Sequence, residues 1–172
     1  MSGSSARVRV FLSYSHDDNG HRRRVLQLGE QLRRDGVQLH MDRFERAAPA
    51  DWNRWFWQQV VQADWVLVIC TRGYRLRHEG KAHRLDGRGG RFDTVVMPDL
   101  YDAAVRATRF LPVLFDPSDR AYIPQRMREA GYTTVNTPEA YALLRERLQQ
   151  APRSAAPTAR HVPARRGGGV TV

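Results

Sequence analysis

Polar side chains that can hold a ligand follow directly after three apolar segments of the chain, at residues 13–18, 42–49 and 71–93. Ser13, Tyr14 and Ser15 precede a predicted helix, where free backbone N–H groups can contact a phosphate. The same three residues equally suit ordinary loop and helix-cap chemistry. Asp42 opens the second polar segment and is a further candidate for ligand binding.

Two carboxylates, Asp93 and Asp99, are the candidates for catalysis. A carboxylate beside a ribose can hold its hydroxyls and stabilise the positive charge that develops when a glycosidic bond breaks. Each residue also has a structural interpretation. Asp93 suits the start of a helix, where it would complement the helix dipole, and Asp99 follows Pro98 and suits a helix cap. Both interpretations stay open for both residues.

The aromatic residues, histidines and cysteine of this sequence indicate a binding site less specifically than the polar segments do. Trp52 is a candidate for stacking on a base, although tryptophans at the spacing of Trp52, Trp55 and Trp57 are more often core or interface residues. The histidines have no metal-ligand spacing and there is one cysteine, so we expect no zinc site and no required cofactor. The chain contains neither a Walker loop nor a GxGxxG sequence.

Alternating strands and helices must position these side chains. Apolar runs predict strands at 7–13, 37–41, 65–70, 109–115 and 131–135. Periodic and capped segments predict helices at 21–34, 52–62, 92–105 and 138–149, and at most a short one at 123–130. This order predicts an α/β, flavodoxin-like, five-stranded parallel sheet with helices on both faces, whose carboxyl edge gathers the three polar segments. Pro112 predicts an edge position or a bulge for its strand, and residues 71–90 predict a long basic loop.

The composition predicts one domain over residues 1–149 and a disordered tail over 150–172, which is rich in Pro, Arg and Gly. The net charge is +10, and the tail carries four arginines and no acid. Such a charge favours weak contact with polyanions. No helix combines a basic stripe with interleaved aromatics, so we expect no specific nucleic-acid site.

Three features bear on location. The longest apolar runs are too short to cross a bilayer, and the first residues lack the pattern of a secretory signal. The lone Cys70 cannot form an internal disulfide, which fits a reducing compartment. We therefore expect a cytoplasmic protein without a transmembrane segment.

Five ordered sequence boxes are similar to those of one known family, the bacterial type of SEFIR domain in the TIR (STIR) superfamily. The first box is Val10-Phe11-Leu12-Ser13-Tyr14-Ser15-His16-Asp17. The later boxes are LRRDGV leading to MDRFE (32–45), WNRW (52–55), ADWVLVICT (63–71), and FLPVLF with YIP (110–124). The set spans roughly Val8 to Leu148 in order.

This resemblance implies a flavodoxin-like fold and two kinds of activity. One is intracellular immune or stress signalling by homotypic self-assembly with other SEFIR or TIR domains. The alternative is hydrolysis of NAD+ as a substrate, activated by oligomerisation. TIR enzymes place a glutamate four residues after a tryptophan, and the matching position here is Val96. The Trp-Glu pair of SEFIR sequences corresponds to Phe92-Asp93, so the resemblance makes Asp93 the candidate carboxylate.

Overall fold

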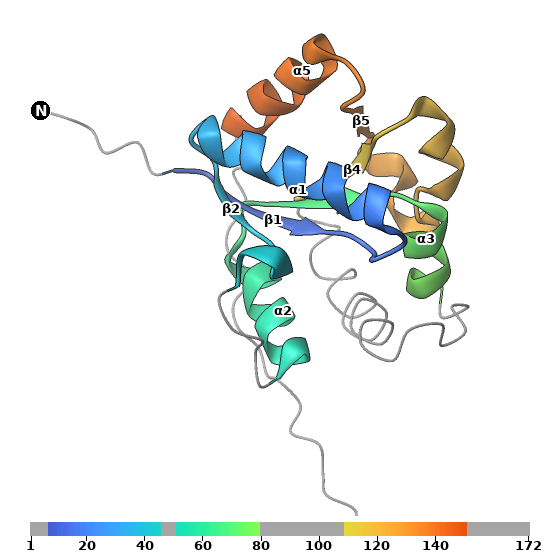
Figure 1. Ribbon diagram of the computed structural model, residues 1–172, viewed down its shortest axis with the longest axis horizontal. Helices are drawn as coiled ribbons and strands as arrows, with labels where there is room; N and C mark the ends of the chain where they lie inside the picture. The colour runs from blue at the N-terminus through green and yellow to red at the C-terminus, as the bar shows by residue number, and fades with distance from the viewer. Residues whose placement is uncertain (1–6, 46–50, 80–108, 151–172) are drawn as a thin grey trace, which may run out of the picture.

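The computed structural model describes residues 7–45, 51–79 and 109–150, and these residues build one parallel sheet (Figure 1). The strand order is β2-β1-β3-β4-β5, and every neighbouring pair is parallel. The strands are β1 (Arg9–Ser13), β2 (Gln38–His40), β3 (Trp65–Ile69), β4 (Phe110–Leu114) and β5 (Thr133–Thr134). The predicted five-stranded flavodoxin-like sheet is therefore confirmed.

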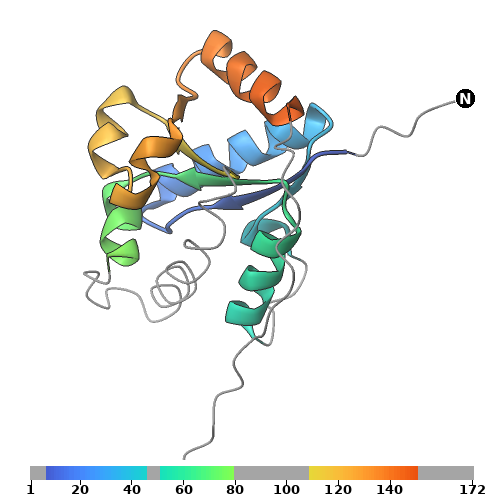
Figure 2. The same ribbon diagram turned by 180° about the vertical axis from the view of Figure 1, so that it is seen from behind.

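Helices cover both faces of the sheet, as predicted (Figures 1 and 2). One face carries α1 (Asn19–Arg34) and α5 (Pro138–Gln149), whose apolar side chains share a core cluster with Val10, Leu12 and Leu67. The other face carries α2 (Trp52–Gln62), α3 (Arg72–His78) and the 3-10 helices η3 (Pro117–Tyr122) and η4 (Gln125–Ala130). Because each strand alternates its side chains, successive residues of β1 and β3 feed the two clusters in turn.

The ends of α1 follow from local chemistry. Asp18 caps the helix by accepting a hydrogen bond of 2.8 Å from the backbone N–H of His21. Its inner face repeats at helical spacing through Val25, Leu28 and Leu32, all buried. Gly36 ends the turn after the helix with a φ of 90°, a left-handed conformation that favours glycine. The chain then enters β2 and the 3-10 helix η1 (Asp42–Phe44).

The expectation for Pro112 is wrong in one respect. β4 lies between β3 and β5, so it is not an edge strand. The carbonyls of Arg109 and Val113 accept hydrogen bonds from the N–H groups of Val66 and Cys70. Backbone groups alternate in direction along a strand, so those of Pro112 point to the other side, towards β5. β5 pairs only with Val113 and Leu114. The missing N–H of Pro112 therefore costs no ladder hydrogen bond to β5.

The expected loop at residues 71–90 is also corrected. Its first part forms α3, a helix of seven residues that Thr71 caps. The predicted helix at 92–105 and the predicted tail at 150–172 lie outside the described residues, apart from Gln150 directly after α5. Within the described ranges, no helix has the length and apolarity that a membrane crossing requires.

Candidate functional site

The carboxyl ends of β1, β2 and β3 bring three polar segments to one edge of the sheet. The carboxyl ends of parallel strands lie at a common edge. From β1 the chain moves to one side of the sheet to form β2 and then crosses to the other side to form β3, so the strand order reverses at β1. Ligands of open α/β sheets bind at such a switch point. The side chains there form two clusters, one towards β2 and one towards α3.

The Asp42 cluster consists of Tyr14, His16 and Asp42. The Tyr14 hydroxyl donates to Oδ1 of Asp42 at 2.7 Å, and Nε2 of His16 lies 2.7 Å from Oδ2. Burial alone would raise the pKa of Asp42, but the hydrogen bonds from His16 and Tyr14 outweigh it and bring that pKa below its ordinary value. An ionised carboxylate only accepts hydrogen bonds, so Nε2 of His16 carries the hydrogen.

This cluster is open on one side. The His16 side chain is 44% exposed and that of Asp42 is 22% exposed. Tyr14 is buried, and burial together with the charge of Asp42 raises the pKa of its hydroxyl, which therefore stays protonated. The arrangement joins the loop after β1 to η1 and leaves one carboxylate and one imidazole within reach of a ligand or a partner.

The Thr71 cluster consists of Ser15, Asp17, Thr71 and Arg77. The hydroxyls of Ser15 and Thr71 share a hydrogen bond of 3.0 Å, and Thr71 also caps α3 by accepting from the N–H of Tyr74 at 3.1 Å. Burial tends to raise the pKa of Asp17, but hydrogen bonds from Thr71, Ser15 and Arg77 lower it overall. The bond from Arg77 is 3.0 Å long. Its members hydrogen-bond to one another, although the side chains of Arg77 and Asp17 remain 18% and 22% exposed. We call it closed in the sense that its polar groups are paired within the cluster.

Gly73 allows the Thr71 cluster to form. A Cβ at this position would lie 2.0 Å from Oδ1 of Asp17, well inside contact distance. Asp17 therefore reaches the backbone of α3 only because residue 73 has no side chain. Closer to the core than this cluster, the hydroxyls of Ser13 and Tyr74 share a buried hydrogen bond of 3.2 Å.

His21 lies beside both clusters and stands out for its lack of partners. The residue is 2% exposed, and neither ring nitrogen has a hydrogen-bond partner. Its ring packs near Tyr14 and edge-on to Phe115. Burial lowers the pKa of His21, and the nearby Asp17 offsets only part of this effect. The imidazole is therefore neutral at neutral pH.

The structure gathers four of the predicted ligand-binding residues at this edge. Ser13, Tyr14, Ser15 and Asp42 all lie there, but the hydroxyls of Ser13 and Ser15 are buried and bind α3. Trp52 begins α2, and its side chain is not among those described. The predicted catalytic residues Asp93 and Asp99 lie outside the described residues.

Sequence reasoning missed the members of the Thr71 cluster on α3. It treated the region of Thr71, Gly73 and Arg77 as an irregular loop. A threonine directly after the predicted strand at 65–70, with a possible helix beginning at the next residue, was the signal that could have found the cap. Within the part of the chain that the structure describes, no group of three His, Cys, Asp or Glu side chains is placed to hold a metal.

Comparisons with known proteins agree with this geometry. A family model for the SEFIR domain matches residues 8–148. A solved structure titled "Crystal Structure of a prokaryotic SEFIR domain" superposes with a TM-score of 0.62 at 23% sequence identity, covering 86% of this chain and 99% of that chain. No curated protein matches the chain. The sequence boxes, the parallel sheet and the family match over most of its length agree that this chain belongs to the SEFIR domain family.

Proposed function

We propose that this SEFIR domain acts in intracellular immune or stress signalling by associating with further copies of itself or with other SEFIR or TIR domains. Family membership supports homotypic contact, because SEFIR domains generally interact with domains of their own kind. The single buried and unpaired Cys70 supports a cytoplasmic setting. The observation that carries the proposal is the outer face of α2.

The outer face of α2 consists of Arg54, Trp57, Gln58 and Val61, which follow one another at helical spacing. Arg54 and Gln58 are exposed, and Trp57 and Val61 are partly exposed, with the rest of each side chain packed against the core. Tryptophan and arginine are the side chains most enriched where protein interfaces gain their binding energy. By contrast, Phe56 is buried in the core. The helix thus offers one apolar and cationic surface beside the Asp42 cluster.

Light scattering across protein concentration tests this proposal. We expect the mass of the wild-type chain to rise with concentration and that of Trp57→Ala to stay monomeric, since truncating an interface tryptophan commonly weakens association by about tenfold or more. Leu143→Ala is the matched control. Leu143 is 64% exposed and lies on α5, on the opposite face of the sheet, so its loss should leave association unchanged. A wild-type chain that remains monomeric throughout would overturn the proposal.

Hydrolysis of NAD+ is the second candidate function, favoured by the ionised and partly exposed carboxylate of Asp42 at the switch point of the sheet. In this proposal Asp93 stabilises the developing ribosyl cation, with Asp99 as the weaker alternative. In the same proposal Asp42 and Trp52 contact the substrate, and no further cofactor is required. Ser13, Tyr14 and Ser15 contribute through backbone N–H groups, because their side chains are buried.

Nicotinamide release, measured across protein concentration, tests this second function. Activity should rise more steeply than concentration if assembly completes the site, and Asp93→Ala should lower it by at least about a hundredfold. Glu30→Gln is the control, because Glu30 is an exposed acid on α1. Activity that survives Asp93→Ala would remove that residue's role, and the absence of nicotinamide release at every concentration would remove the function.

A further inference from the structure

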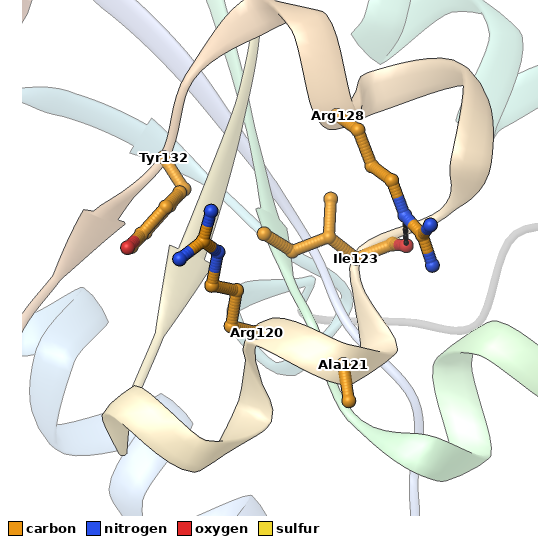
Figure 3. A pocket seen from close by; sticks show the side chains of 5 residues that line it. All are labelled: Arg120, Ala121, Ile123, Arg128 and Tyr132. Atoms are coloured by element: carbon orange, nitrogen blue, oxygen red, sulfur yellow. Dashed lines mark hydrogen bonds between the residues drawn. The ribbon is translucent and has the colours of Figure 1, made fainter.

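An open surface pocket of about 400 Å³, called the cavity below, lies where η3 and η4 meet the start of β5. It is lined by Arg120, Ala121, Ile123, Arg128 and Tyr132, which come from η3, η4 and the turn before β5 (Figure 3). Small-molecule sites in proteins typically occupy about 300–1,000 Å³. The cavity is therefore large enough for a small ligand.

Two guanidinium groups flank the apolar floor of this cavity. Ile123 is buried at 3% exposure and lies between Arg120 and Arg128 in Figure 3. None of the five lining residues is acidic. Neither arginine forms an ion pair with any described residue, so the cavity presents positive charge that the described part of the domain does not neutralise.

Each guanidinium belongs to an exposed residue and makes one contact that leaves other donors free. Arg120 lies over the ring of Tyr132, 5.5 Å from its centroid, which uses the face of the guanidinium and leaves its in-plane N–H groups. Arg128 donates through Nε to the carbonyl of Ile123 at 3.5 Å, which leaves its two terminal nitrogens. Guanidinium forks of this kind match the oxygens of phosphate groups.

The wall of the cavity is tied to α3. Arg75 donates to the carbonyl of Ala121 at 2.9 Å and is itself paired with Glu79 at 2.8 Å. Those contacts fix the turn that carries Arg120 and place a neutralised arginine behind it. A backbone held before a ligand arrives lowers the conformational freedom that is lost on binding.

From this geometry we propose that the cavity binds a small ligand through its phosphate groups. The two guanidiniums hold phosphate oxygens on either side of Ile123, and the 39% exposed Tyr132 offers the part of its ring that Arg120 does not cover to the ring of a nucleoside. This site lies outside the surface proposed for homotypic contact and does not depend on it.

Titration of the full chain with three probes tests the proposal, with calorimetry as the measurement. Adenosine diphosphate has both the charged phosphate groups and the aromatic base, pyrophosphate has only the phosphate groups, and adenosine has only the nucleoside. We expect adenosine diphosphate to bind and adenosine to bind at least about tenfold more weakly. Pyrophosphate that binds as tightly as the nucleotide assigns the site to free polyphosphates, and weaker binding assigns it to nucleotides. Absence of binding by both phosphate probes, or equal binding of adenosine, overturns the proposal.

Matched charge variants locate the binding. Arg120→Gln and Arg128→Gln should each weaken binding of adenosine diphosphate by about tenfold. Arg23→Gln removes the same charge from an exposed position on α1 and should change it by less than about twofold. An equal loss in Arg23→Gln would show diffuse attraction to a basic protein and overturn the site. Thermal unfolding without ligand verifies that each variant is folded.

Discussion

The two polar clusters at the carboxyl edge of the sheet contain similar side chains and differ in how they use them. The Thr71 cluster is closed, because hydrogen bonds among Ser15, Asp17, Thr71 and Arg77 join the loop after β1 to α3 and its cap. The carboxylates of Asp17 and Asp42 are equally exposed, at 22% each, and the Asp42 cluster is the more open one because its His16 side chain is 44% exposed. Polar groups that hydrogen-bond to one another hold α3 in place, whereas polar groups with unused donors or acceptors can still bind a partner.

Thr71→Ala should produce the largest effect on the closed cluster. It removes the cap of α3 and the hydroxyl that Ser15 and Asp17 contact, so we expect the free energy of unfolding to fall by about 2 kcal/mol. Thr137→Ala is the matched control, because Thr137 caps α5 by accepting from the N–H of Ala140 and is exposed. Its expected loss is about 1 kcal/mol. Equal losses in urea denaturation would contradict the role of the cluster.

His21→Leu should sharpen the comparison by removing the buried imidazole beside both clusters. We expect the free energy of unfolding at pH 7 to rise by up to about 1 kcal/mol, because an unpaired polar group is replaced by an apolar one. The helix cap is retained, since Asp18 binds the backbone N–H of residue 21.

The pH dependence of the same variant gives an independent test. The folded pKa of His21 lies below its ordinary value, so the unfolded chain takes up the proton first as the pH falls below about 6.5. Wild-type stability should therefore decrease on acidification through that window, and His21→Leu should decrease less steeply. His40, whose pKa burial also lowers, leaves a remaining slope in both proteins. Identical slopes would show that His21 does not titrate as described.

His16→Ala should give the smallest effect, because it removes an exposed member of the open cluster. We expect a change within about 0.5 kcal/mol, since exposed ion pairs contribute little and Tyr14 still donates to Asp42. Tyr14→Phe removes the buried donor instead and should cost about 1 kcal/mol. A larger loss for His16→Ala than for Tyr14→Phe would mean that the cluster is not open in the way described.

The sequence predicted the sheet well because its central strands are distinct. β3 is an uninterrupted apolar run and is buried at every position, and β4 follows the same rule despite Pro112. The helix α3 was missed because its seven residues contain three arginines and a glycine and have no apolar face. Short helices of this kind depend on tertiary contacts, here the ones made by Thr71 and Asp17.

The sequence predicted where the candidate site lies, but not which of its side chains hydrogen-bond to each other. Sheet topology alone places Ser13, Tyr14, Ser15 and Asp42 at one edge. Which hydroxyls stay free depends on partners 61 and 56 residues away, Tyr74 for Ser13 and Thr71 for Ser15. Local sequence patterns carry no information on such pairs. The roles predicted for Asp93 and Asp99 stay predictions.

Concentration-dependent amide and indole NMR spectra test the central claim, the proposal that this SEFIR domain associates through the Asp42 cluster and the outer face of α2. Between micromolar and millimolar protein we expect the indole N–H of Trp57 and the backbone amides of His16 and Arg43 to shift or broaden. The amides of Ser15 and Thr71 should stay unchanged. Spectra that do not depend on concentration, or changes confined to α5 around Leu143, would contradict the account.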